Sequence, residues 1–497
     1  MYVPLIGRIS LLDWPVIVLS FVLAWSEFIL TSITYLLPDT VISIFTTSVK
    51  LIIRRNPLKS DLFFKNNELP EGINQKRYDI MINISKAETI DQMVKVFGYE
   101  IEAHVMRTKD DYVLTIHRLV GKPRTANGKV VYLHHGLLMC SEVWVTMLDK
   151  HKNLPYILYD LGYDVWLGNN RGNKYSQKHI SFEASSVEFW NFSIDDYAIY
   201  DIPDTIDYIL NWTKKQKIIY IGFSQGTAQA FALISITPQL NEKIEQFIAI
   251  SPATTPNGLT SRFLDILLKT SPNILYLLFS RKILMPSVQF WKTIVYPTLF
   301  DVMIDWSNWL LFNWKSTNIT RFQKIASYAH LYSTTSVKVV VHWFQIMKSG
   351  NFQMYHESNS LISGLNPTSY NLKLIKVPIH LIYGTTDSLV DIDIMRSQLP
   401  RKTTTIQPVP YHEHLDNLWG DDVYEAVFKH VLEYLGEDSS IFDRIVYDDV
   451  RLIEDIIDDD NTFVDESYLK SASRKRILDT ASIELANGYA RNTNISS

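Results

Sequence analysis

The stretch IIYIGFSQGT, residues 218–227, decides the fold because it places a serine between two glycines at the end of an apolar run. The β-branched residues before Gly222 favour a buried strand, and the run TAQAFA (227–232) that follows is compatible with a helix. A strand and a helix joined in this way are the context of a nucleophile elbow, in which a G-x-S-x-G turn exposes the hydroxyl of Ser224. Glycine suits both positions because the turn leaves no room for side chains beside the serine. A bare G-x-S-x-G is a weak signal, so the prediction depends on the strand and helix around it.

An acid and a histidine follow the serine in the order that α/β-hydrolases use. The run VPIHLIYG (377–384) predicts a buried strand, and Asp387 lies just after it. A second run, TTTIQPVP (403–410), leads into His412 and His414. Folds of this kind place their sites beyond the carboxyl ends of parallel strands. We therefore predict a triad of Ser224, Asp387 and His414, in which the imidazole accepts the serine proton and the carboxylate orients the imidazole.

Neighbouring residues compete for these roles. Asp387 could instead cap a following helix, as many aspartates after strands do. Asp391 and Asp393 are rival carboxylates, although both lie later and are expected inside that helix. His412 competes with His414, and spacing alone does not separate the two histidines.

A second glycine turn predicts the oxyanion hole. The run KVVYLHHGLL (129–138) is a predicted strand that ends in a turn at Gly136. Backbone N–H groups in such a turn, together with the N–H after the nucleophile, stabilise the tetrahedral oxyanion of acyl transfer. We predict that the donors are Leu137 and Gln225. Because both are backbone donors, this prediction depends on position and not on residue type.

With these motifs in place, the chain resembles the acid lipase family, which includes gastric and lysosomal lipases and the yeast steryl ester hydrolases. The similarity covers roughly residues 96–435 and includes FGYE (97–100), TKDDYVLTIHRL (108–119), HGLL (135–138), GNNRGN (168–173), EFWNFS (188–193), YDIP (200–203), KSGNFQ (348–353) and GTTDSLVD (384–391). The resemblance implies an α/β-hydrolase fold with a mostly parallel central sheet, and the triad and oxyanion donors named above. It favours His414 over His412 because Leu-Asp follows His414. Phe223 stands where the relatives usually have histidine, a departure that should not affect the mechanism.

Composition narrows the class of protein. The chain has 497 residues, of which 46% are hydrophobic, so it can bury a full α/β core and still carry extra segments. Its net charge of −5 does not indicate the basic surface that binds nucleic acid. The single cysteine, Cys140, excludes an intrachain disulfide and fits a reducing compartment. The sequence has no metal-ligand spacing and no phosphate-binding loop, so we expect neither metal nor cofactor.

The N-terminus predicts a hydrophobic anchor. Residues 14–37 are apolar except chiefly for Glu27, and as a helix they are long enough to cross or enter a hydrocarbon layer. A shorter apolar run, 41–53, is followed by basic residues, which place the next domain on the cytosolic side. Two arrangements remain open, a hairpin that suits a lipid droplet and a single span that suits the endoplasmic reticulum. A helix buried in the protein is the less favoured third option.

The predicted order of domains follows from these shifts in composition. It consists of an N-terminal hydrophobic anchor (1–58), a polar linker (59–95), the first part of the hydrolase core (96–252), a helical cap (253–370), the second part of the core (371–436), and an acidic tail expected to be disordered (437–497). The cap is rich in aromatic residues, and part of this aromatic load is expected to line an acyl or sterol pocket.

The sequence thus predicts a serine esterase anchored to a membrane or lipid droplet that acts on neutral lipid. Within the family, the extreme N-terminus, with Met1, Tyr2, Gly7 and Arg8, is most similar to the yeast lipid-droplet steryl ester hydrolases. Steryl esters are therefore the first choice of substrate and the droplet surface the first choice of location. A triacylglycerol lipase, an acyltransferase that uses the same acyl-enzyme, and an inactive droplet-binding protein are the alternatives.

Overall fold

A computed structural model describes residues 73–122, 125–256, 272–284, 297–357 and 367–438, with a few isolated positions between 18 and 44. The chain divides into two compact units, Met1–Ser439 and Ser440–Ser497, and every described residue belongs to the first. Apart from the isolated positions, the predicted anchor lies outside the described residues, as does nearly all of the predicted tail. Within the described residues, no helix combines the length and apolar character that a membrane crossing requires.

The centre of the first unit is one mixed sheet with the strand order β1-β2-β4-β3-β6-β7-β8-β9, and β5 pairs with β2 at its side. The strands are β1 (Glu100–Arg107), β2 (Tyr112–Val120), β3 (Val130–His134), β4 (Asp164–Leu167), β5 (Lys178–His179), β6 (Ile218–Phe223), β7 (Ile244–Ile250), β8 (Ile379–Gly384) and β9 (Thr404–Val409). The pairings β4–β3, β3–β6, β6–β7, β7–β8 and β8–β9 are parallel, whereas β2 pairs antiparallel with β1, β4 and β5. The predicted mostly parallel α/β sheet is therefore confirmed.

The central strands are apolar because both faces of the sheet are covered. Every residue of β3 and of β6 is buried, and so is nearly all of β7. A continuous run of β-branched and aromatic residues, without the alternation of a half-exposed strand, is what such strands require. The runs around residues 129–134 and 218–222 predict β3 and β6 in the sequence.

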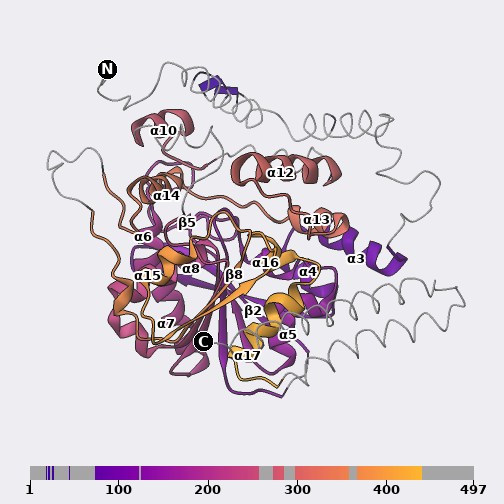
Figure 1. Ribbon diagram of the computed structural model, residues 1–497. Coiled ribbons are helices and arrows are strands. Elements are labelled where there is room, and N and C mark those ends of the chain that lie inside the picture. The colour runs from indigo at the N-terminus through magenta and orange to yellow at the C-terminus, as the bar shows by residue number, and fades with distance from the viewer. Residues whose placement is uncertain are drawn as a thin grey trace, which may run out of the picture. The chain divides into compact units, whose positions relative to one another are not determined.

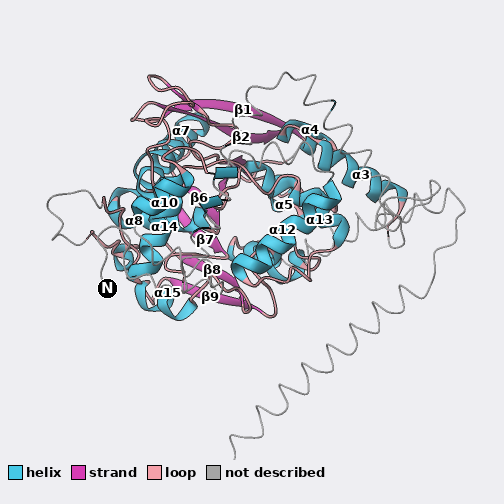
Figure 2. Cartoon of the chain, turned by 90° about the horizontal axis from the view of Figure 1, so that it is seen from above, coloured by secondary structure: helices cyan, strands magenta, loops and turns pink. Residues whose placement is uncertain are grey.

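Helices cover both faces of the sheet. The longer ones are α3 (Gln75–Lys86), α4 (Ile90–Lys95), α5 (Leu154–Asp160), α7 (Ile202–Thr213), α8 (Gln225–Ile236), α10 (Pro272–Phe279), α12 (Pro297–Phe312), α13 (Arg321–Tyr328), α14 (Val337–Ser349), α15 (Ile392–Gln398) and α17 (Lys429–Tyr434). Shorter helical segments are η3 (Ser141–Val145), η4 (Lys150–Lys152), α6 (Ile194–Asp196), η5 (Tyr197–Asp201), η6 (Pro238–Glu242), η7 (Leu372–Leu374), α16 (Asp416–Trp419) and η8 (Tyr424–Phe428). Figures 1 and 2 show α7, α8 and α15 on one face of the sheet and α5 on the other, which is the doubly wound arrangement.

The segment between β7 and β8 contributes helices α10, α12, α13 and α14, which lie in two pairs, α10 beside α14 and α12 beside α13 (Figures 1 and 2). Within this segment, an isolated antiparallel bridge pairs Ile283, after α10, with Ser336, before α14. Ser336 also caps α14, with its hydroxyl accepting the N–H of Val339. This segment falls within the range predicted as a helical cap.

Two helices lie where the sequence predicts a polar linker. Helix α3 begins after Asn74, whose side chain caps it, and buries Met81 and Ile84. Helix α4 buries Ile90, Met93 and Val94. The described part of residues 59–95 is thus largely helical and packed against the hydrolase unit. Each apolar stripe is only two or three residues long, too short for periodicity to stand out.

Candidate active site

Ser224 sits in the sharp turn between β6 and α8. Its backbone has φ of 53° and ψ of −122°, a strained conformation for a residue other than glycine. Its N–H donates to the carbonyl of Ile250 at the end of β7, 3.0 Å away, which fixes the turn to the neighbouring strand. The strain is the structural signature of a nucleophile elbow.

Close approach of the backbone explains a glycine in each of two turns, the elbow and the turn after β3. A Cβ on Gly226 would lie 2.6 Å from the carbonyl oxygen of His134 and 2.7 Å from that of His135. A Cβ on Gly136 would lie 3.0 Å from the Cβ of Ser224. The turn after β3 and the turn after β6 therefore press directly against each other, which brings the two predicted oxyanion segments together.

The three residues predicted as a triad form one hydrogen-bonded chain. The Nε2 atom of His414 lies 2.8 Å from the Oγ atom of Ser224, and its Nδ1 atom lies 2.6 Å from Oδ2 of Asp387. The other carboxylate oxygen of Asp387 accepts the N–H of Leu389 at 2.9 Å. The imidazole and the carboxylate are both buried. A hydroxyl, an imidazole and a carboxylate connected in this order form the geometry of nucleophilic acyl transfer.

Contacts on all sides hold His414 in place. The Ser251 hydroxyl donates to its carbonyl at 2.9 Å. The indole of Trp314, from the segment between α12 and α13, stacks on the imidazole with ring centroids 5.1 Å apart and planes 6° apart. Phe223, the departure from the family motif, packs against the imidazole with centroids 5.3 Å apart. The ring is thus clamped between the elbow and the cap.

The rival residues have other partners. His412 makes hydrogen bonds with Asn417, Asp422 and Asn318, and its carbonyl accepts bonds from Thr386. These contacts tie the loop after β9 to its surroundings and occupy both ring nitrogens of His412.

The rival carboxylates belong to the following helix. Asp391 is the N-cap of α15 and accepts the N–H of Ile394 at 2.9 Å. Asp393 lies in the first turn of the same helix. The helix begins at Ile392, so Asp387 is not its cap.

The predicted oxyanion donors lie next to the nucleophile. Gln225 is the first residue of α8, so its N–H has no acceptor within the helix. Leu137 follows Gly136 in the turn that packs against Ser224. Their role as donors stays a prediction, as does the catalytic role of the triad.

Sequence reasoning missed the residues that support the site. Trp314 was only one of many cap aromatics, and no sequence signal connects it with a histidine a hundred positions away. Trp343 of α14 donates its indole N–H to the side chain of Gln225 at 2.7 Å. Among the described residues, no cluster of histidine, cysteine or acidic side chains is arranged to hold a metal ion.

Fold and site geometry together define an α/β-hydrolase. The family model described as alpha/beta hydrolase fold matches residues 129–413, and that of the partial alpha/beta-hydrolase lipase region matches residues 90–148. The chain belongs to this lipase family, the class of carboxylic ester hydrolases to which the sequence pointed, and the predicted resemblance is confirmed.

Three relatives indicate how much of the chain is shared. A "Probable lipase" of Schizosaccharomyces pombe is 41% identical over 86% of this chain and 94% of that protein. A second "Probable lipase" of the same yeast is 48% identical over 71% of this chain and 78% of that protein. The gastric triacylglycerol lipase of Mus musculus is 35% identical over 70% of this chain and 92% of that protein.

Proposed function

We propose that the protein is a serine esterase of lipid surfaces that hydrolyses steryl esters to sterol and fatty acid. The observation that supports it most directly is the hydrogen-bonded chain from Asp387 through His414 to Ser224. The choice of steryl ester rests on the resemblance of the N-terminus to the yeast enzymes.

In the proposed reaction, the Oγ atom of Ser224 attacks the ester carbonyl while Nε2 of His414 takes its proton. The carboxylate of Asp387 holds the tautomer with the proton on Nδ1 and stabilises the imidazolium. The N–H groups of Leu137 and Gln225 receive the negative charge on the carbonyl oxygen. His414 then protonates the departing alcohol, and water, activated by the same imidazole, releases the fatty acid.

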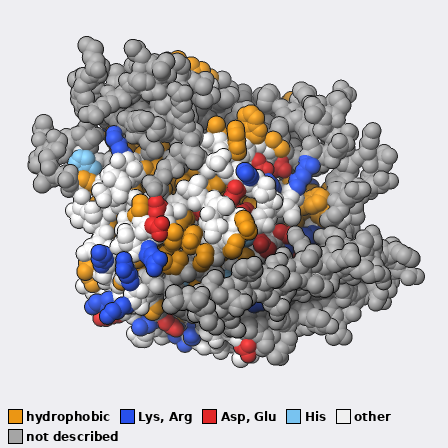
Figure 3. Space-filling model, viewed as in Figure 1, with side chains coloured by type: hydrophobic (Ala, Val, Ile, Leu, Met, Phe, Trp, Pro, Cys, Tyr) orange, Lys and Arg blue, Asp and Glu red, His pale blue; other side chains and the backbone are white. Residues whose placement is uncertain are grey.

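An exposed apolar face on the cap supports action at a lipid surface. Along α12, Val302, Met303, Trp306, Trp309 and Leu310 lie at the spacing of one helix face and are all exposed, with Trp306 exposed by 72%. Hydrophobic side chains gather over this helix in Figure 3. Helix α12 leads directly to Trp314, which stacks on the catalytic imidazole, so a surface that binds this face would lie close to the site.

We further propose that residues 1–58 anchor the protein to a lipid droplet with its catalytic domain on the cytosolic side, the endoplasmic reticulum being the alternative. The apolar composition of residues 14–37 and 41–53 supports the anchor. Removal of residues 1–55 should release the protein into the soluble fraction. The Ser224→Ala variant should lose hydrolysis and still associate with droplets. A truncated protein that remains on droplets would contradict the anchor.

Triacylglycerol lipase activity is the second candidate, favoured by the 35% identity with the mouse gastric triacylglycerol lipase. Both substrates present the same ester to the same triad, so only the pocket can separate them. Purified protein should be tested on matched emulsions of cholesteryl oleate and triolein. We expect the faster turnover on cholesteryl oleate, whereas faster turnover on triolein would replace our first choice by the second.

A further inference from the structure

Each predicted oxyanion donor is the N–H of a peptide unit whose carbonyl oxygen accepts a hydrogen bond from a side chain. The N–H of Leu137 shares a peptide unit with the carbonyl of Gly136, and the N–H of Gln225 shares one with the carbonyl of Ser224. In a planar trans peptide, the C=O and N–H bonds point in opposite directions. A group that holds the carbonyl oxygen therefore also aims the N–H on the other side.

The Gly136 carbonyl is held by the side chain of His135, whose Nδ1 lies 2.8 Å from the carbonyl oxygen. The backbone N–H of Asn170 points at Nε2 of the same ring, 3.2 Å away. Because a backbone N–H can only donate, Nε2 carries the lone pair and the proton sits on Nδ1. Burial lowers the pKa of His135 to about 4, so the ring is neutral at neutral pH and keeps this tautomer.

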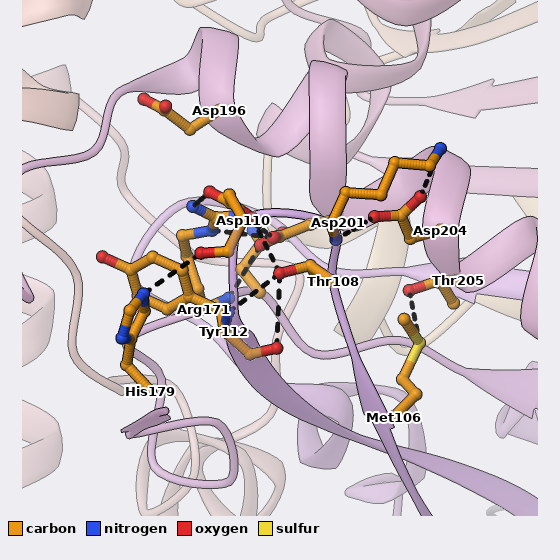
Figure 4. Close-up of polar contacts among 12 residues, drawn as sticks. Met106, Thr108, Asp110, Tyr112, Arg171, His179, Asp196, Asp201, Asp204 and Thr205 are labelled. Atoms are coloured by element: carbon orange, nitrogen blue, oxygen red, sulfur yellow. Dashed lines mark hydrogen bonds and ion pairs between the residues drawn. The ribbon is translucent and has the colours of Figure 1, made fainter. Parts of the chain in front are cut away.

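The loop that presents Asn170 is itself rigidly held by the next residue. The backbone N–H and Nε of Arg171 donate to the two carboxylate oxygens of Asp201 at 2.9 and 2.7 Å. Its terminal nitrogens donate to both oxygens of Asp110, and its guanidinium stacks over the ring of Tyr112 at 3.9 Å. Figure 4 shows this guanidinium between the two carboxylates. The ion-pair cluster thus fixes the N–H that sets the tautomer of His135.

The Ser224 carbonyl is held in a comparable way by Thr227, which lies in the first turn of α8. The backbone N–H of Thr227 donates to this carbonyl at 2.9 Å, and its hydroxyl donates at 2.7 Å. The N–H of Ala253 donates to the same hydroxyl oxygen at 3.0 Å. Because the N–H of Ala253 can only donate, the hydroxyl oxygen of Thr227 must accept from it, and the hydroxyl proton is left to donate to the Ser224 carbonyl. Thr227 is fully buried.

We infer that His135 and Thr227 are positioning residues of the oxyanion hole, each holding the carbonyl side of a peptide whose N–H receives the negative charge. Neither residue contacts substrate in this role. The inference rests on the proposed ester hydrolysis and gives a role to the neutral histidine beside the oxyanion turn. Removing an oxyanion donor typically costs about 10² to 10³ in kcat, and a displaced donor should cost less.

The test compares variants that lose each contact with variants that keep it. His135→Leu and Thr227→Val remove the side-chain donors, and should lower kcat on a soluble p-nitrophenyl ester by roughly 10- to 100-fold with KM little changed. His135→Asn places an amide N–H near the position of Nδ1, and Thr227→Ser keeps the hydroxyl, so both should recover most of kcat. His135→Gln, whose amide lies nearer the position of Nε2, should not recover it and serves if the leucine variant does not fold.

A matched control separates positioning from loss of a buried histidine. His104 of β1 is also buried, and its two ring nitrogens lie 3.2 Å from the Tyr208 hydroxyl on α7 and 3.3 Å from the Glu102 carboxylate on β1. His104→Leu should therefore leave kcat within about threefold of the parent.

A trifluoromethyl ketone, which forms an oxyanion on the serine, gives a second readout. Its affinity should fall with kcat/KM across the His135 and Thr227 variants, because both depend on the same two N–H groups. The inference is overturned if kcat of His135→Leu, His135→Gln and Thr227→Val stays within threefold of the parent value. It is also overturned if kcat of His135→Asn and Thr227→Ser falls as far as kcat of those three variants. Failure of the proposed function is distinct, since the parent would then turn over no ester, or Ser224→Ala would turn it over as fast as the parent.

Discussion

Replacing Asp387 by asparagine should reverse the tautomer of the catalytic histidine without changing the shape of the site. In the parent protein, one carboxylate oxygen accepts the N–H of Leu389 at 2.9 Å and the other faces Nδ1 of His414 at 2.6 Å. The N–H of Leu389 can only donate, so the amide oxygen of the asparagine side chain will take the position facing it. The amide NH₂ is then turned toward Nδ1, which must accept.

The size of the effect follows from this geometry. With the lone pair on Nδ1, the imidazole proton moves to Nε2. The Nε2 atom, 2.8 Å from the Oγ atom of Ser224, can then no longer accept the serine proton. The same inversion in serine proteases lowers kcat by about 10⁴-fold. At about 1.36 kcal/mol per factor of ten, this is a loss of about 5 kcal/mol of transition-state stabilisation.

The assay is the steady-state hydrolysis of a soluble p-nitrophenyl ester, with thermal unfolding as a check of the fold. Asp391→Asn is the matched control, because Asp391 caps α15 and asparagine caps a helix equally well. We expect near-parental kcat for Asp391→Asn and a loss of about 10⁴-fold for Asp387→Asn. If Asp387→Asn kept a tenth of the parental kcat, the assignment of the acid would be wrong.

Three further predictions concern the elbow, the cap and the buried histidine. Gly226→Ala should destabilise the protein by several kcal/mol or abolish hydrolysis, because its Cβ would lie 2.6 Å from the carbonyl oxygen of His134; urea unfolding measures the stability and ester hydrolysis the activity, and parental values of both would contradict the close approach. Replacing Trp306 and Trp309 by serine should lower turnover of emulsified lipid but not of soluble ester, and an equal loss on both substrates would argue against a docking face for lipid. Because burial lowers the pKa of His135 to about 4 from an ordinary 6.5, the unfolded chain binds this proton more readily. The contribution of neutral His135 to the free energy of unfolding is therefore complete above about pH 6.5 and falls by up to about 3 kcal/mol as the pH is lowered to 4. In urea unfolding, the free energy of unfolding of His135→Asn should fall less over this pH range than that of the parent.

The elbow and the sheet could be predicted from the sequence because their signals are local. The run before Ser224 is apolar throughout, and two glycines flank the serine, so strand, turn and helix are all encoded within a few residues. The positions of Asp387 and His414 followed from the order of strands, since parallel strands bring their carboxyl ends to one edge. The family resemblance added the choice between His412 and His414.

The support of the site was not predictable because it depends on contacts between distant segments. The stacking of Trp314 on His414 joins the cap to the last strand loop, and nothing in either sequence segment indicates it. The hydrogen bond from His135 to the next residue is local, but its tautomer is set by Asn170, which lies on another strand end. The helices α3 and α4 were missed because each buries too few residues to form a recognisable stripe.

The most direct test of the account is mass spectrometry of the protein after reaction with a fluorophosphonate. The account predicts one adduct per chain, on the peptide that contains Ser224, and much slower labelling of the His414→Ala variant. The Ser224→Ala variant should form no adduct and hydrolyse no ester. An adduct on another residue, or ester turnover that survives Ser224→Ala, would contradict the catalytic role of this serine.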